Sequence, residues 1–172
     1  MKYLSTLGLD YVHSIFQLSD GSLVSCYLVD TAGTERFRAM MELYYKNADC
    51  CLLVYDVTNR DSFEECKNYY NKKLKEYSDD IIKTIVLGNK TDLVEKRVVE
   101  PEEGANFANE NNYIFMEASC KDNYNVSDAF TSLIELTNAE YKKRGIDITV
   151  RKIKRADSSQ FIGNKSKNKS CC

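Results

Sequence analysis

Apolar residues occur in short continuous runs along this chain and at helical spacing between the runs. Three runs bounded by polar residues are typical of strands buried on both faces: residues 50–55, 84–88 and 113–117. Before them, residues 7–18 and 23–29 form two extended segments whose connection contains Asp20-Gly21, a hairpin signal. The pattern therefore predicts an antiparallel hairpin followed by three buried strands.

The segments between the apolar runs predict helices. Residues 62–77 begin with the capping pair Ser62 and Glu65, and Pro101 begins a second helix with acidic residues in its first turn. The apolar stripes are Phe63, Cys66, Tyr70 and Leu74 in the first helix, and Val126, Ala129, Phe130, Leu133, Ile134, Thr137 and Tyr141 in the last. Strands that alternate with helices predict an α/β domain, a mainly parallel sheet with helices on both faces.

Composition adds limits to this picture. The chain of 172 residues, 43% hydrophobic and 29% charged, fits one globular domain. No apolar run is long enough to span a bilayer, and the first residues are too polar for a signal peptide. Seven Cys without a C-x-x-C spacing indicate a reduced, cytosolic protein rather than a disulfide or zinc framework.

Charge divides the chain into a body and a tail. Residues 145–172 hold seven basic and two acidic residues, net +5, while the rest holds 17 basic and 24 acidic residues, net −7. The tail lacks periodicity and is rich in Lys, Ser and Asn, so we expect a domain over residues 1–144 and a disordered tail after it. Such a tail either meets an anionic surface or is simply solvated.

Three polar motifs follow strands and carry the candidate chemistry: Asp30-Thr31-Ala32-Gly33, Asn89-Lys90-Thr91-Asp92 and Ala118-Ser119-Cys120-Lys121. The last two lie at carboxyl ends of buried strands, where open α/β sheets bind ligands. Asp92 can accept hydrogen bonds from both N1–H and the exocyclic amine of guanine, a pair of donors that adenine lacks. In combination, the three motifs resemble the guanine-nucleotide-binding apparatus of small GTPases.

Further segments narrow the resemblance to the Rab family over about residues 5 to 144: Leu7-Gly8-Leu9-Asp10-Tyr11, Arg36-Phe37-Arg38, Tyr44-Tyr45-Lys46-Asn47-Ala48 and Leu53-Val54-Tyr55-Asp56-Val57-Thr58. The resemblance implies a P-loop NTPase-like fold and a GTP/GDP switch with Mg²⁺ that regulates vesicle traffic. It also implies Rab effectors, exchange factors and GTPase-activating proteins as partners. Switch and effector contacts are then expected at Leu7, Gly8, Asp10, Tyr11, Arg36, Phe37, Tyr44 and Tyr45.

The same resemblance implies roles for the motif residues. Asn89 bonds the other edge of the purine, the stem of Lys90 lies along the base plane, and the backbone of Ser119, Cys120 and Lys121 meets guanine O6. Cys120 stands where the family usually has Ala, which matters little where the backbone makes the contact.

Around the phosphates, Asp30 would hold Mg²⁺ through water, Thr6 would ligate it directly, and the Gly33 amide would reach the γ-phosphate. Thr34 stands where the family has the Gln that orients the attacking water. We therefore expect slow intrinsic hydrolysis, although activating proteins of this family can supply both Arg and Gln.

The sequence departs from the family in its phosphate loop. None of the seven glycines is followed by Lys, so the pattern G-x-x-x-x-G-K-[ST] is missing. The family's first strand, phosphate loop and first helix would precede Thr6. Without that central strand, unpaired backbone groups would cost about 1–3 kcal/mol each, so we expect roughly 30 further residues in the intact protein. The alternative is a pseudo-GTPase that holds no nucleotide and acts as a scaffold or competitor for Rab partners.

The chain ends in Cys171-Cys172, which resembles the double-cysteine ending that Rabs use for geranylgeranylation. Two lipids anchor a protein stably where one is marginal, and a basic tail adds attraction to anionic lipid. The resemblance implies an escort protein and a GDP-dissociation inhibitor as partners, and a location in the cytosol and on the cytoplasmic face of endomembranes. No nucleic-acid partner is expected.

Overall fold

The computed structural model of the chain describes residues 9–31, 44–77 and 82–148. The remaining residues, which include Thr6, Gly33, Thr34 and the terminal cysteine pair, lie outside the described part. The expected disorder of the tail therefore stays a prediction for residues 149–172.

A three-stranded parallel sheet forms the centre of the molecule. Its strands are β3 (Cys50–Asp56), β4 (Lys83–Asn89) and β5 (Ile114–Glu117), in the spatial order β3-β4-β5. All three coincide with the predicted apolar runs to within a residue or so. The parallel register pairs Asp56 with Asn89 and Gly88 with Glu117, so the loops that follow the strands share one edge of the sheet.

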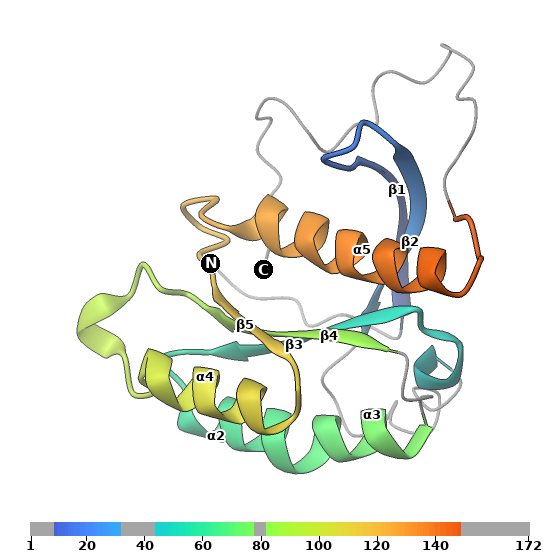
Figure 1. Ribbon diagram of the computed structural model, residues 1–172. Helices are drawn as coiled ribbons and strands as arrows, with labels where there is room; N and C mark the ends of the chain where they lie inside the picture. Colours follow the sequence, from blue (N-terminus) through green and yellow to red (C-terminus); the bar gives the residue numbers. More distant parts are fainter. Residues whose placement is uncertain (1–8, 32–43, 78–81, 149–172) are drawn as a thin grey trace.

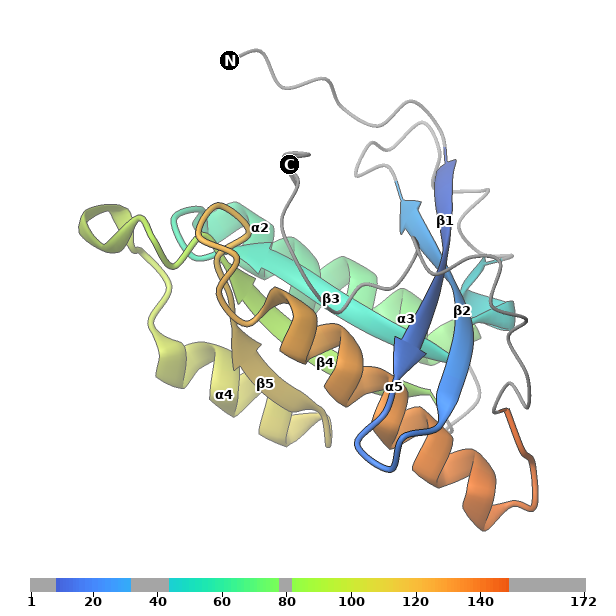
Figure 2. The ribbon, with the colours of Figure 1, turned by 90° about the horizontal axis from the view of Figure 1, so that it is seen from above.

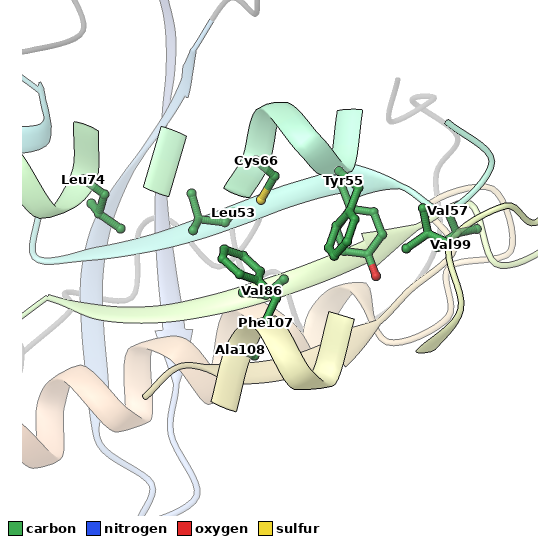
Figure 3. Packing of buried hydrophobic residues seen from close by; sticks show 10 residues of the cluster. Leu53, Tyr55, Val57, Cys66, Leu74, Val86, Val99, Phe107 and Ala108 are labelled. Carbon is green, nitrogen blue, oxygen red and sulfur yellow. The ribbon is translucent and has the colours of Figure 1, made fainter. Parts of the chain in front are cut away.

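Helices cover both faces of this sheet, as predicted (Figure 1). One face carries α4 (Pro101–Glu110) and a long helix made of α2 (Arg60–Glu65), the π-helical turn η2 (Cys66–Tyr70) and α3 (Asn71–Tyr77). The other face carries α5 (Val126–Lys143), and a short 3₁₀ turn, η3 (Val94–Lys96), follows β4. Between the sheet and the first group lies the main apolar core (Figure 3): Leu53, Tyr55, Val57, Phe63, Cys66, Leu74, Val86, Val99, Phe107 and Ala108.

The long helix begins earlier than the sequence predicted. Its N-cap is Asn59, whose side chain accepts hydrogen bonds from the amides of Asp61 and Ser62, so the expected capping pair of Ser62 with Glu65 is wrong. Ser62 Oγ instead bonds the backbone of Asn59 and Asp56. The predicted stripe is confirmed, since Phe63, Cys66 and Leu74 are buried in the main core and Tyr70 packs against it. The π-helical turn adds one residue to a turn, and Asn71 is buried next to this stripe as well.

The predicted hairpin is present as β1 (Leu9–Gln17) and β2 (Leu23–Thr31). The turn between them contains Gly21 with φ +79°, a conformation that glycine adopts without strain. The hairpin lies beside α5 (Figure 2). It packs on this helix through a second, smaller core in which Phe16 and Val24 meet Ile134. It pairs only with itself, so the described strands form two separate sheets.

The separation of the two sheets leaves apolar side chains in solvent. Val54, in the middle of β3, is 51% exposed, and Val12 on β1 is 54% exposed. The prediction that residues 50–55 are buried on both faces is therefore wrong for this part of the strand. Among the described strands, β2 and β3 each have a single hydrogen-bonded neighbour.

Candidate functional site

The loops that follow β4 and β5 are joined by hydrogen bonds at the carboxyl edge of the sheet. The carboxamide oxygen of Asn89 accepts from its neighbour's amide, that of Lys90, at 2.8 Å and from the amide of Cys120 at 3.2 Å. Both the amide and the hydroxyl of Thr91 donate to the carbonyl of Ala118, at 3.2 and 3.1 Å. Asn89 therefore ties the loop after β4 to the loop after β5.

Asp92 lies at the centre of this arrangement. Its side chain is 6% exposed and receives two different donors, one on each carboxylate oxygen. Ser119 Oγ donates to Oδ1 at 2.8 Å, and Lys121 Nζ approaches Oδ2 at 3.2 Å. The bond from Ser119, with that from Lys121, outweighs burial and holds the pKa of Asp92 below its ordinary value. The group is an ionised, oriented acceptor at neutral pH.

The loop after β5 is held in a tight shape by its own backbone. Ser119 and Tyr124 exchange amide-to-carbonyl hydrogen bonds at 3.1 and 2.9 Å, and the amide of Asp122 donates to Ser119 Oγ. Asn123 and Asn125 adopt positive φ, and the side chain of Asn125 donates to the carbonyl of Glu117. Among residues other than Gly, Asn is several-fold enriched at positive φ. Two Asn residues just after the motif are therefore a sequence signal for a tight loop, and the motif itself does not contain it.

Sequence reasoning missed one charged residue at the site. Asp56, the last residue of β3, lies 2.6 Å from the ammonium of Lys90. It entered the sequence analysis only as a member of a longer motif. Its position at the end of the strand beside β4 is the signal that could have identified it, because residues at the ends of adjacent parallel strands lie side by side.

The other predicted site residues are only partly described. Asp30 is exposed near the end of β2, where it pairs in register with Asp10. Tyr11 is 70% exposed on the hairpin, and Tyr44 is 36% exposed, whereas Tyr45 packs against the main core. Thr6, Leu7, Gly8, Gly33, Thr34, Arg36, Phe37, Cys171 and Cys172 lie outside the described residues.

Two kinds of feature are absent from the described residues. In residues 9–31, 44–77 and 82–148 no three His, Cys, Asp or Glu side chains gather as a metal-binding group. None of the helices in these ranges combines the length and apolar character that a bilayer span requires.

Comparison with known proteins agrees with this geometry. The model of the Ras family matches residues 1–139. Rab-8B of Dictyostelium discoideum is 34% identical over 171 residues, 99% of this chain and 79% of that protein. Rab-26 of the rat is 34% identical over 170 residues, and the GTP-binding protein ypt1 of Schizosaccharomyces pombe is 39% identical over 132 residues. These alignments cover 99% and 77% of this chain.

The chain belongs to the Rab group of the Ras family and has the Ras-like small GTPase fold. It spans 63% of rat Rab-26 and 64% of ypt1, that is, less than two thirds of each.

Proposed function

We propose that this protein is a guanine-nucleotide-dependent switch of the Rab type, acting in membrane traffic. One observation carries the proposal: Asp92 is an ionised carboxylate, fixed by Ser119 and Lys121, in a loop that Asn89 ties to the loop after β5. A carboxylate held in this way is a bidentate acceptor that suits guanine and excludes adenine. The relative ypt1 is a GTP-binding protein, which supports the proposal.

Base selectivity tests the proposal directly. GMP, AMP and XMP are titrated into the ¹⁵N-labelled chain, and the amide signals of Asp92 and Cys120 are followed. We expect a preference for GMP over AMP. Asp92→Asn should weaken GMP binding about tenfold to hundredfold, the range for losing hydrogen bonds to a charged group, and should favour XMP. The matched control is Asp122→Asn, which removes the same charge from an exposed position of the neighbouring loop. Equal binding of GMP and AMP by the parent chain would refute the base site.

The chemistry of three further residues suits Mg²⁺ and the phosphate groups of a nucleotide. Asp30 is an exposed carboxylate at the end of β2, which suits a water-mediated Mg²⁺ contact. When bound, Mg²⁺ with the triphosphate would supply charge neutralisation, with Thr6 as a direct ligand and the Gly33 amide at the γ-phosphate.

Thr34 in this proposal makes the switch slow. A Thr side chain is too short to orient the attacking water and lacks an amide. In a fusion that places the phosphate-loop unit of ypt1 before Met1, Thr34→Gln should raise single-turnover hydrolysis of GTP. An unchanged rate would mean that another group orders the water.

The tail provides the proposed membrane attachment. Geranylgeranylation of Cys171 and Cys172 would anchor the protein on the cytoplasmic face of endomembranes, with an escort protein and a GDP-dissociation inhibitor as handling partners. Replacing both Cys by Ser should move the protein to the soluble fraction of cells. Neutralising the basic run should only weaken or redirect binding, because screened charges contribute less than two prenyl chains; this run is Arg151, Lys152, Lys154 and Arg155. A double Cys variant that still sediments with membranes would refute the lipid anchor.

The switch and effector surface is proposed to include the hairpin and the helical turn at residues 44–47. Tyr11 and Tyr44 are the exposed aromatic residues of this set in the described part of the chain. Large exposed aromatic residues are enriched in protein interfaces, which supports a role in contacting effectors and regulators.

A further inference from the structure

Lys90 is held at both ends. Its backbone has φ +69°, a left-handed conformation that is uncommon for a residue other than Gly, Asn or Asp. Its ammonium lies 2.6 Å from Asp56 Oδ2, across the ends of β3 and β4. The side chains of Lys90 and Asp56 are 45% and 20% exposed, so this ion pair is half-buried at the same edge of the sheet as Asp92.

Asp56 is itself held in place. Its other carboxylate oxygen, Oδ1, accepts hydrogen bonds from the amide of Thr58 at 2.8 Å and from its hydroxyl at 2.6 Å. The amide of Asp56 donates to Ser62 Oγ at 3.0 Å, which ties the end of β3 to α2. Burial alone would raise the pKa of Asp56, but the bonds from Lys90 and Thr58 outweigh it and lower the pKa. The carboxylate is therefore a fixed anchor with one oxygen directed to Lys90.

Stability is a weak reason for such a pair. Partly exposed lysine–carboxylate pairs contribute little to folding, because solvent screens them and ordering the long side chains opposes them. Ordering has another consequence, however. A free lysine stem has many rotamers and loses side-chain entropy when a ligand orders it. A stem that is already fixed loses less entropy on binding, which favours affinity. The stem of Lys90 belongs to the loop that presents Asn89 and Asp92.

We propose that Asp56 is a positioning residue of the base site: it fixes the ammonium of Lys90, so that the lysine stem stands as a preformed wall for the plane of the guanine base. The role rests on the proposed guanine-binding function. Asp56 touches the ligand nowhere in this arrangement and acts only through Lys90.

A double-mutant cycle tests the role. The four proteins are the parent chain, Asp56→Asn, Lys90→Met and the double variant; the Met replacement keeps an unbranched apolar stem and removes the ammonium. The probe is GMP, titrated against the amide signals of Asp92 and Cys120. Asp56→Asn should raise the Kd for GMP about threefold to tenfold, the cost of ordering one rotamer-rich side chain. In the Lys90→Met background the same substitution should change the Kd less than about twofold.

The cycle separates a positioning role from a structural one. If Asp56 mainly stabilised the end of β3 through Thr58, Asp56→Asn would weaken GMP binding equally in both backgrounds, and the proposal would be overturned. An unchanged Kd in the single variant would overturn it as well. Asp61→Asn, which removes an exposed carboxylate from the start of α2, is the control for net charge.

Failure of this role and failure of the base site give different results. A parent chain that binds GMP with an Asp92-dependent preference, but shows no coupling between Asp56 and Lys90, keeps its proposed function and loses only this role. A parent chain without that preference overturns both. A third readout needs no nucleotide: the ¹³Cε and ¹⁵Nζ signals of Lys90 should shift in Asp56→Asn and stay constant in Asp61→Asn. Constant signals in both variants would show that the ion pair does not form in solution.

Discussion

At the carboxyl ends of β4 and β5, the side chains of Asn89, Asp92 and Ser119 all bond protein groups, whereas Val12 of the hairpin and Val54 of β3 face solvent. The first region is a polar site whose partners are already in place. The second combines half-exposed valines with two strands that each have one paired neighbour among the described residues.

This difference follows from where each region finds its partners. The loops that follow β4 and β5, called the base loops below, are supported by adjacent strands of one parallel sheet, so their polar groups meet over short distances. The hairpin meets the rest of the described chain mainly through the small core on α5. The proposed base site can therefore be preformed in a chain whose described hairpin and parallel sheet share no strand pairing.

The largest expected effect concerns affinity for a whole nucleotide. The 172-residue chain should bind Mg²⁺–GDP about four orders of magnitude more weakly than ypt1, about 5.5 kcal/mol. The sequence contains the base motifs but no glycine followed by Lys, and a phosphate loop provides much of the attraction for the charged groups. Calorimetric titration of both proteins measures the difference. Submicromolar, Mg²⁺-dependent binding by this chain would contradict the prediction.

Replacing one buried phenylalanine in each core compares how much the main core and the hairpin core contribute to stability. Phe63 is 1% exposed and contacts the rings of Tyr55 and Phe107, at centroid distances of 4.8 and 6.0 Å. Phe63→Ala should lower the free energy of unfolding by about 4 kcal/mol, because it opens a cavity in the main core. Phe16, equally buried in the hairpin core, should cost about 3 kcal/mol when replaced by Ala.

Urea unfolding measures the loss of stability in both variants. Amide spectra of the base loops then show whether each substitution also disturbs those loops. Phe16→Ala should leave the signals of Asp92 and Cys120 in place under native conditions, since neither loop rests on the hairpin core. Base-loop signals that broaden in Phe16→Ala would show that the two regions are coupled more strongly than the packing indicates.

A matched pair of valines on adjacent strands tests the exposure of β3. Val86 on β4 is fully buried in the main core, whereas Val54 on β3 is 51% exposed. Val86→Thr should cost about 2 kcal/mol, because it places a hydroxyl in an apolar site. Val54→Thr should change the free energy of unfolding by less than about 0.5 kcal/mol. Equal losses in urea unfolding would mean that Val54 is covered in solution.

The smallest expected effect concerns the loss of folding stability at low pH. Hydrogen bonds from Arg60, with that from the amide of Glu100, lower the pKa of Glu103 to about 2. A carboxylate with a lowered pKa stabilises the fold above its ordinary pKa, and that contribution disappears as the pH falls through about 2. Glu103→Gln should therefore flatten the loss of stability between about pH 4.5 and 2, measured by urea midpoints. Glu102→Gln, which removes an exposed carboxylate from the same helical turn, is the control for net charge.

The sequence alone determined the elements that rest on local chemistry. Apolar runs located β3, β4 and β5, because a strand covered by helices needs continuous apolar residues. Asp20-Gly21 located the hairpin turn, and Pro101 located the start of α4. The position of the proposed base motif was predictable for a similar reason: its residues directly follow β4 and β5, so the ends of the strands place them.

Tertiary structure decided what depends on neighbours distant in sequence. Asn59 replaces Ser62 as the helix cap because the helix starts at Arg60, where the side chain of Asn59 accepts from the amides of Asp61 and Ser62. The π-helical turn brings Asn71 inward, where its side chain donates to Asn111 and accepts from the hydroxyl of Tyr113. These partners lie 40 and 42 residues away along the chain, and no local pattern contains them.

Two further properties depend on distant neighbours in the same way. The exposure of Val54 depends on which strand lies beside β3, and an apolar run looks the same whether one or two neighbours cover it. The pairing of Asp56 with Lys90 depends on the parallel register that brings the ends of β3 and β4 together. The sequence supplied the chemical groups of the proposed base site. The packing of the strands decided which of these groups pair, because hydrogen bonds and ion pairs form only between atoms that the fold brings within reach.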